Sequence, residues 1–464
     1  MREYRGSEIR NIAVVGHGAS GKTSLVDALA FVSGSSKRHG SVRDGTALTD
    51  TAPEEIERGY SINLGVAFAE WMGTKINIID TPGFSDFQGD ATAGLAAADG
   101  ALCVVSATAG VEVGTERMFR EAMRRKDPVL FVVSMMDKDH ADFDRIYEQV
   151  KTRLSAKVIP VEIPLGEGPD FHGVANLFTK KALLFKRGSK GGEYQEVDIP
   201  ADYRSQFDRY YQELLESISS TDDSLLERYL EGGEITREEM IVGMKEAMKR
   251  MELFPLFCAS SELNYGMQAV LTTIVELMPT AWEMEEVHAF KGAEGNRTVE
   301  IHADENAPFA ALVFKTMSEP HVGDVSFFRI FAGSIVNGQE VFNATRDTAE
   351  KLNTSPCRRG RSGSRLPASV PVTSAAWRSS AARTPTTRCP HVSIRCGFRR
   401  FSSPSRSSTW PSTRRRARTR RSFRLGCTSC TRRIPPSRRT TTRRPTRPSS
   451  PASASGTSRS RSRA

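Results

Sequence analysis

The chain has 464 residues, of which 38% are hydrophobic, so it is long enough for two to four domains and is not disordered throughout. The formal net charge of +10 conceals two opposite parts. From Thr354 onward there are 28 Arg and no Lys, Asp or Glu, so the first 353 residues hold 37 basic and 55 acidic residues. The sequence therefore joins an acidic body to a basic tail.

Two features of the sequence predict where the protein resides. Of the seven cysteines, only Cys103 and Cys258 precede the tail, each within an apolar run that predicts a buried strand, which is typical of a reducing compartment. The N-terminal stretch MREYRGSEIRNIAVVG lacks the apolar region of a signal peptide, and no apolar run is long enough to cross a membrane. We therefore expect a cytoplasmic protein with no membrane partner.

Short apolar runs alternate with helical patterns through the first part of the chain. Residues 9–15 predict a strand, a glycine-rich loop leads to a helix over 22–31, and residues 33–62 lack a period and predict a mobile loop. The elements that follow are strands at 64–71 and 75–79, helices near 88–98 and 113–126, and buried strands in ALCVVSA and PVLFVVSM. This alternation predicts a doubly wound α/β domain, which binds ligands at the carboxyl ends of its strands.

The α/β domain is expected to span residues 1–280 and to contain an insertion. Over 157–255 a β-like part precedes a charged helical part, which predicts an α+β subdomain inserted before the last strand and helix. A linker is expected over 281–306. From 307 to 353 apolar and polar residues alternate between Gly and Asn-Gly turns, which predicts the start of an antiparallel β-barrel as a second domain.

Residues 354–464 form a low-complexity segment of Arg, Ser, Thr, Pro and Ala without a sustained period, so we expect this tail to be disordered. One interpretation is a basic tail that binds nucleic acid. We favour a change of reading frame near Asn353, because the break falls inside an unfinished barrel and the tail's residue types mostly have codons rich in G and C. Translating the coding DNA in the other two frames tests this, since further barrel strands should appear in one of them.

The string GHGASGKT, Gly16 to Thr23, fits the pattern G-x-x-x-x-G-K-[ST] between a predicted strand and a predicted helix, as a phosphate-binding loop requires. Its glycines let backbone N–H groups point toward phosphate oxygens, and the helix N-terminus adds a positive dipole. Lys22 would neutralise the β- and γ-phosphates, and the Thr23 hydroxyl would bind Mg²⁺. The nucleotide-binding residues expected here are Gly16, His17, Gly18, Ala19, Ser20, Gly21, Lys22, Thr23 and Ser24.

A second phosphate-facing turn is expected in DTPGFSDF, after the third strand. Asp80 ends that strand, where a water-bridged partner of Mg²⁺ belongs, and Gly83 leaves room and an N–H group for the γ-phosphate. The string DTPG alone is often only a turn, but its place downstream of a phosphate-binding loop favours the functional interpretation. Phe84 then stands where a residue that orients the attacking water is usual, and a phenyl ring has no hydrogen-bonding group.

Two more strings predict a nucleotide switch and a base-binding site. In ERGYSI, Ser61 offers a hydroxyl to Mg²⁺ when the γ-phosphate is present, although it could be an ordinary loop serine. In SMMD, Ser134 to Asp137, the Asp137 carboxylate can accept two hydrogen bonds from guanine, or it could cap the following helix. The string CASS ends the next strand, where a backbone N–H at Ser260 could meet a guanine oxygen.

In this order, the strings ERGYSI, DTPGFSDF, MMDKDHADFDR, IPVEIPLGEG and PFAALVFKTMSEPHVGDVSFFRIFAGSI make residues 5–353 resemble the translational GTPases of the elongation factor G type. The resemblance implies GTP or GDP and Mg²⁺ as ligands, with the metal held by Thr23, Ser61 and Asp80. It implies GTP hydrolysis at Lys22, Gly83 and position 84, coupled to ribosomal translocation or ribosome release. It also implies a monomer that binds rRNA and ribosomal proteins directly, and tRNA and mRNA indirectly.

Some positions depart from the pattern of that family. Ala19 and Phe84 stand where the family has an Asp, thought to help hold a monovalent cation, and the water-orienting His. Ser134 and Met135 replace the Asn and Lys of the guanine motif. A Ser hydroxyl reaches less far than an Asn carboxamide, whereas a Met stem can still pack over the base. Because Asp137 is retained, GTP remains the expected nucleotide, with slow hydrolysis.

Three functions are consistent with the sequence. The first is a ribosome-dependent GTPase, and the second is a regulatory switch on the ribosome that binds GTP with little hydrolysis, which Phe84 and Ala19 favour. The third is an RNA-binding protein acting through its basic tail, which requires the tail to be genuine. Nothing after Asn353 resembles the later domains of the family, so the chain could bind GTP and yet be unable to drive translocation.

Overall fold

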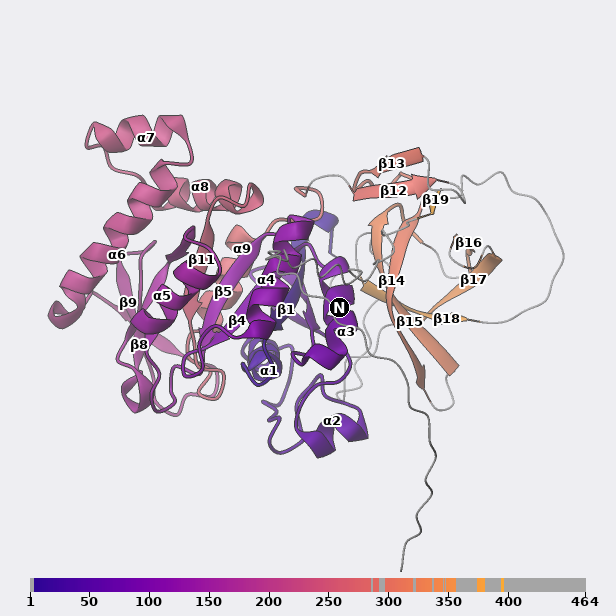
Figure 1. The fold of residues 1–464 in the computed structure, drawn as a ribbon, viewed down its shortest axis with the longest axis horizontal. Helices are drawn as coiled ribbons and strands as arrows, with labels where there is room; N and C mark the ends of the chain where they lie inside the picture. Colours follow the sequence, from indigo (N-terminus) through magenta and orange to yellow (C-terminus); the bar gives the residue numbers. More distant parts are fainter. Residues whose placement is uncertain are drawn as a thin grey trace, which may run out of the picture. The chain divides into compact units, whose positions relative to one another are not determined.

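The structure is a computed structural model, and it describes residues 4–284, 287–291, 297–319, 323–335, 338–344, 346, 348–355, 374–379 and 394–395. Figure 1 shows the helices and strands of these residues, coloured along the sequence.

A seven-stranded sheet forms the centre of the α/β domain (Figure 1). Its strands are β1 Ile9–Gly16, β2 Gly65–Trp71, β3 Thr74–Asp80, β4 Gly100–Ser106, β5 Val129–Ser134, β6 Val158–Pro160 and β11 Phe254–Cys258. They run in the order β2-β3-β1-β4-β5-β11-β6, and every neighbouring pair is parallel except β2 with β3. Strands β1, β3, β4, β5 and β11 are buried along their whole length, which accounts for their near-continuous apolar runs.

Helices alternate with these strands along the chain: α1 Lys22–Val32, α3 Gln88–Ala96, α4 Val113–Arg125, α5 Phe143–Arg153 and α9 Met267–Leu277. Helix α1 packs against α9, and α3 packs against α4. Helix α4 illustrates how the sequence dictates this packing, because its buried residues recur at three- and four-residue spacing on one face: Thr115, Met118, Phe119 and Ala122. The predicted α/β fold is confirmed.

The loop between α1 and β2 is more ordered than the sequence predicted. Within 33–62 lies a short helix, α2 Pro53–Arg58, which starts with a proline that needs no N–H partner and ends at Gly59 with a φ of 70°. The buried Glu55 carboxylate accepts hydrogen bonds from backbone N–H groups on both sides of this helix, including those of Ala52 and Asn63. The lack of a period therefore did not mean a lack of structure.

Helix α1 also holds this loop through one carboxylate. Asp27, which is buried, accepts a hydrogen bond from the Gly40 N–H at 2.5 Å and another from the Leu48 N–H at 2.8 Å. Two separate points of the loop are thereby fixed to the helix that follows the phosphate-binding loop.

The region predicted as an inserted subdomain contains both strands and helices: β7 Glu162–Leu165, β8 Gly173–Asn176, β9 Lys181–Phe185, β10 Tyr194–Val197, α6 Ala201–Ser219, α7 Asp223–Leu230 and α8 Arg237–Lys249. The strands form an antiparallel sheet in the order β10-β9-β8-β7. Strands β6 and β11 belong to the central sheet, so that sheet extends into both ends of 157–255. The short 3₁₀ helices among the described residues are η1 Gly6–Glu8, η2 Ser85–Phe87 and η3 Gly168–Asp170.

Beyond residue 284 the described elements are strands: β12 Val287–Lys291, β13 Arg297–Ile301, β14 Ala310–Glu319, β15 Gly323–Ala332, β16 Glu340–Asn343, β17 Thr348–Ser355, β18 Ser374–Ser379 and β19 Ile394–Arg395. Strands β12 and β13 pair within 281–306, where only a linker was predicted. A second antiparallel sheet has the order β14-β15-β18-β17-β16. Strands β18 and β19 fall in the predicted tail, and its other residues beyond Ser355 lie outside the described part. The domain boundaries given above stay predictions.

Strands β14 and β15 contact the α/β domain at two kinds of site. Phe314, Val325 and Phe327 join a cluster of buried apolar residues with Leu64 and Phe68. The fully buried Arg329 guanidinium donates to both oxygens of Asp99, at 2.7 and 2.9 Å. These contacts connect the second sheet to the strands and turns that bear the candidate site.

Candidate nucleotide-binding site

The phosphate-binding loop joins the end of β1 to the start of α1, as predicted. Gly16 and Gly21 have φ angles of 147° and 88°, and Ala19 also has a positive φ of 61°. A Cβ on Gly16 would lie 2.5 Å from the backbone oxygen of Val104, so only glycine fits there. The turn exposes consecutive N–H groups at a helix N-terminus, which is an arrangement suited to anions.

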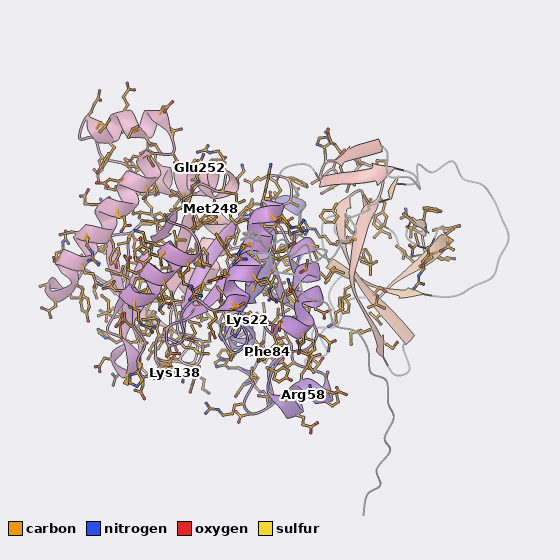
Figure 2. All side chains as sticks on the ribbon, viewed as in Figure 1. Lys22, Arg58, Phe84, Lys138, Met248 and Glu252 are labelled. Atoms are coloured by element: carbon orange, nitrogen blue, oxygen red, sulfur yellow. The ribbon has the colours of Figure 1, made fainter. Side chains whose placement is uncertain are left out.

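Lys22 is the buried cation of this loop, and Figure 2 labels it together with Phe84. Its ammonium donates a hydrogen bond to the backbone oxygen of His17 at 2.6 Å. Burial lowers the pKa of the Lys22 ammonium to about 8, and the nearby Asp80 carboxylate opposes this shift. A phosphate bound beside the Lys22 ammonium would stabilise its charged form and so offset the effect of burial on its pKa.

His17 and Ser20 complete the loop in different ways. The His17 imidazole accepts from the Gly114 N–H at 3.2 Å and lies 3.3 Å from a Glu112 oxygen, so it ties the loop to the start of α4. The Ser20 hydroxyl is buried and has no hydrogen-bond partner in the described structure. Ser20 does not line the cavity described below, so its hydroxyl remains a buried group whose partner the structure does not show.

The residues predicted to hold Mg²⁺ do converge. The Thr23 and Ser61 hydroxyl oxygens are 2.9 Å apart, although 38 residues separate them. Asp80 is buried at the end of β3, where one carboxylate oxygen accepts from the Thr49 hydroxyl at 2.6 Å and the other has no hydrogen-bond partner in the described structure. Burial raises the pKa of the Asp80 carboxyl to about 7, and Asp50 adds to this shift. A divalent cation would relieve the cost of charging it.

Asp50 is a member of this cluster that the sequence analysis missed. It accepts a hydrogen bond from the Ser61 hydroxyl at 2.7 Å. It belongs to the loop before α2, where no period or motif marks it. The one signal in the sequence was that it lies a few residues before the string ERGYSI. The described residues contain no group of three or more His, Cys, Asp and Glu that could hold a metal by themselves.

Gly83 and Phe84 lie at the part of the site where the terminal phosphate is predicted to bind, which is called the phosphate end below. A Cβ on Gly83 would lie 2.3 Å from the Lys22 ammonium nitrogen and 2.6 Å from the Gly18 backbone nitrogen, so the turn after β3 passes directly over the loop. The Phe84 ring lies against Gly18 and is 39% exposed. Tyr60 meets that ring edge to face, with the ring centroids 4.8 Å apart. The phosphate end is therefore covered by two aromatic rings.

Part of the predicted site lines one cavity of about 420 Å³. The predicted residues that do not line it are Gly16, His17, Ser20, Asp80, Ser134, Asp137 and Ser260. Those of the sequence prediction that line it are Gly18, Ala19, Gly21, Lys22, Thr23, Ser24, Ser61, Gly83, Phe84 and Met135. Asp50, Tyr60 and Val42 were not predicted and line it too. Its mixture of backbone amides, one buried lysine and hydroxyl groups is suited to a polyphosphate.

Ser134 and Met135, which were predicted to lie near the base, both contact the phosphate-binding loop. The Ser134 hydroxyl donates to the backbone oxygen of Ser20 at 2.7 Å, so this short side chain does reach the loop. The Met135 methyl carbon lies 3.2 Å from where a Cβ of Gly21 would be. Met135 also has a φ of 62°, which marks a tight turn after β5.

Asp137 does not cap the helix that follows it. Its carboxylate accepts from the Ser260 hydroxyl at 2.6 Å and pairs with the Lys138 ammonium at 3.0 Å. The residue that caps α5 is Asp142, so the alternative interpretation of Asp137 does not hold. The Ser260 N–H donates to the backbone oxygen of Tyr265 at 3.0 Å. Ser260 therefore orients Asp137 here, and its N–H is already used within the turn.

A glycine-rich loop between a strand and a helix, a buried lysine and a hydroxyl–carboxylate cluster at one sheet edge together define a P-loop nucleotide-binding domain of the GTPase fold. The chain belongs to the family described as "Elongation factor Tu GTP binding domain", whose sequence pattern matches residues 7–280. Within it, the chain is of the elongation factor G type, which confirms the resemblance derived from its motifs.

Two similar proteins show how much of the chain matches known relatives. The elongation factor G of Thermotoga neapolitana is 35% identical over 346 residues, covering 75% of this chain and 50% of that protein. A solved crystal structure from Thermus thermophilus superposes with a TM-score of 0.70 and 32% identity, covering 81% of this chain and 53% of that one. The chain thus spans about half the length of the relatives it matches. Within the described ranges, no helix combines the length and apolarity needed to cross a membrane.

Proposed function

We propose that the protein binds GTP and Mg²⁺ at the P-loop and hydrolyses GTP slowly on the ribosome, in a cycle coupled to translocation or ribosome release. The observation that carries this proposal is the 2.9 Å contact between the Thr23 and Ser61 hydroxyls, because it joins the P-loop to the loop that precedes β2. A ligand that binds both hydroxyls would fix that loop, and losing it would release the loop.

Each group of the site has a task in this proposal. The N–H groups of residues 16–24 and the Lys22 ammonium bind the phosphates, and Gly83 offers an N–H to the terminal phosphate. Thr23 and Ser61 would hold Mg²⁺, with Asp80 acting through water, and the ion would neutralise charge that develops on the phosphates. Asp137, held by Ser260, would accept hydrogen bonds from the guanine ring, and Ser134 keeps the base end joined to the P-loop.

Slow hydrolysis follows from the chemistry of Phe84. The ring lies at the rim of the cavity but neither donates nor accepts a hydrogen bond, so it cannot orient a water. The loss of one positioning group typically lowers a rate by orders of magnitude and leaves binding intact. The same observation supports a second candidate, a regulatory switch on the ribosome that binds GTP and hydrolyses little of it.

The partners in this proposal are rRNA and ribosomal proteins, with tRNA and mRNA contacted indirectly, and the protein acts as a cytoplasmic monomer. The third possibility, RNA binding through the basic tail, concerns a segment of which the structure describes, beyond Ser355, only β18 and β19. It predicts that removing residues 356–464 abolishes RNA binding, whereas our proposal predicts that GTP binding survives.

The deciding experiment is single-turnover hydrolysis of GTP by the full chain, measured with and without ribosomes, beside equilibrium binding of GTP, GDP and ATP. We expect guanine nucleotides to bind and ATP not to compete, with a slow rate that ribosomes stimulate. Tight GTP binding without ribosome-stimulated turnover would favour the regulatory switch. Equal affinity for ATP and GTP would overturn the assignment of Asp137.

A further inference from the structure

Tyr60 carries a hydroxyl group and lines the cavity beside Phe84. Both residues line the cavity, and their rings meet edge to face with centroids 4.8 Å apart and an interplanar angle of 62°. Phe87 adds a second ring, 6.5 Å from that of Tyr60. Because aromatic neighbours restrict a phenol ring without consuming its hydroxyl, this packing positions Tyr60 and leaves its oxygen for other contacts.

The next residue anchors Tyr60 from the backbone side. Ser61 is bonded to Thr23 at 2.9 Å and to Asp50 at 2.7 Å, within the cluster assigned above to Mg²⁺. Tyr60 is therefore the direct neighbour in sequence of a residue whose hydroxyl is assigned to Mg²⁺. The backbone link places it on the same loop that a terminal phosphate would order.

The Tyr60 hydroxyl is also polarised. Arg58 donates a hydrogen bond to the Tyr60 oxygen, with the two heavy atoms 3.2 Å apart. A guanidinium has donors only, so the phenol oxygen is the acceptor in this contact and its own hydrogen remains available. Donation from a cation to the oxygen makes a phenol a better hydrogen-bond donor.

Resting on the function proposed above, we propose that Tyr60 supplies the polar contact that Phe84 lacks, by donating a hydrogen bond to a terminal phosphate oxygen during hydrolysis. In that step the water oxygen forms a bond to the γ-phosphorus as the bond to the β–γ bridging oxygen breaks. GDP leaves with the bridging oxygen and its electron pair, and the proton of the water passes to the phosphate product. Tyr60 gains and loses no proton, and its hydrogen bond stabilises negative charge on the phosphoryl group.

This role differs from that of a simple aromatic cover. A cover would keep water out equally well with or without the hydroxyl, so Tyr60→Phe would leave the rate unchanged. A donor makes its contact mainly in the transition state, so its loss lowers the rate and leaves nucleotide affinity unchanged. The contact need not be formed before the nucleotide binds, because such hydrogen bonds often tighten only in the complex.

The test is ribosome-stimulated, single-turnover hydrolysis by the full chain, with the dissociation constants of GTP and GDP measured in parallel. For Tyr60→Phe we expect the rate to fall roughly 10²-fold while both dissociation constants change less than about twofold. Tyr194→Phe removes an exposed phenol on β10 and is the matched control, which should equal the unaltered protein. Arg58→Met should lower the rate less than Tyr60→Phe, and the double variant should be no slower than Tyr60→Phe alone.

The outcomes separate this inference from the proposed function. If the unaltered chain hydrolyses GTP on the ribosome and Tyr60→Phe matches its rate, the role of Tyr60 is overturned and the GTPase stands. If the unaltered chain binds GTP but shows no hydrolysis under any condition, both fall. An equal loss of rate and of GTP affinity in Tyr60→Phe would also overturn the inference, since it would show a structural role.

Discussion

Phe84 and Gly18 are complementary: the phenyl ring occupies the space that a side chain at residue 18 would fill. A Cβ on Gly18 would lie 2.8 Å from one ring carbon of Phe84 and 2.9 Å from the next. The missing side chain in the P-loop therefore allows the ring to lie directly on the phosphate end of the site. The ring is part of a fitted surface, which explains how an apolar residue is accommodated there.

Replacing Phe84 with His restores a hydrogen-bonding group at that position. We expect Phe84→His to raise the ribosome-stimulated rate of GTP hydrolysis by about 10²-fold or more, because one positioned acid–base group commonly contributes that much. Single-turnover kinetics measures the change. Tyr194→His puts an imidazole at an exposed position of β10, away from the cavity, and should leave the rate unaltered. A Phe84→His variant no faster than its parent would mean that another defect limits the reaction.

The base preference should depend on Asp137. A carboxylate accepts two hydrogen bonds from guanine, whereas the amide in Asp137→Asn offers one acceptor and a donor that opposes the guanine amino group. Since hydrogen bonds to charged groups contribute about 1.5–3 kcal/mol each, GDP affinity should fall by at least about 10²-fold and xanthosine diphosphate should bind better. Competition binding measures both. Asp139→Asn, at an exposed position of the same turn, should bind GDP normally; if it behaves like Asp137→Asn, the assignment fails.

Glu162 makes stability depend on pH. Burial raises the pKa of its carboxyl from 4.5 to about 8, although Asn176 donates to one oxygen at 3.1 Å. Between those values the folded chain keeps the proton and the unfolded chain releases it, so the free energy of unfolding falls as pH rises through this window and levels off above about 8.

The variant Glu162→Gln cannot ionise, so it removes this dependence. Relative to its parent it should gain little at pH 4.5 and a few kcal/mol of unfolding free energy near pH 8. Urea denaturation at the two pH values measures the difference. Glu196→Gln, at an exposed position of β10, should show no such trend. A gain for Glu162→Gln that is the same at both pH values would contradict the assignment.

Breaking the ion pair between Arg329 and Asp99 should destabilise the fold mainly because it leaves a buried charge without a partner. Asp99 also accepts from the Asn11 amide at 2.7 Å, so the carboxylate is fixed and desolvated. Arg329→Met leaves the Asp99 carboxylate buried without the cation that pairs with it, which should lower the free energy of unfolding by about 3–5 kcal/mol. Adding Asp99→Asn to this variant removes the buried charge and should recover part of that loss. Chemical denaturation measures both variants. Lys181→Met breaks a solvent-exposed pair with Asp198 and should leave the free energy of unfolding nearly unchanged; an equally small effect for Arg329→Met would refute the argument.

The sequence predicted those parts of the fold that local pattern determines. Strand β1 and helices α1 and α4 lie within a residue or two of their predicted bounds, because apolar runs and helical spacing mark them directly. Helix α2 was missed, because a buried Glu55 and a starting proline hold it in a segment without a period. Strands β12 and β13 were missed because too little apolar alternation marks them.

Some residues of the candidate site could likewise be predicted from the sequence, and others could not. Lys22 and Thr23 belong to a motif whose spacing is itself the signal, so their positions could be stated from the sequence. Asp50 and Tyr60 come to the cavity only because the loop folds back onto α1, and no spacing in the sequence encodes that approach. The contact of the Ser134 hydroxyl with the P-loop likewise depends on the separation of two strands, which only the coordinates give.

Asp27 does not line the cavity, yet it affects the conformational entropy that binding a nucleotide would cost. Its two hydrogen bonds, to Gly40 and Leu48, close an arc of chain that carries Val42 to the cavity wall. Fixing the backbone of one residue costs roughly 1–2 kcal/mol of conformational entropy. Residues in that arc have already lost this freedom before a ligand arrives. Less of the interaction energy of each new contact is then offset by ordering the loop, so more of it contributes to the binding free energy.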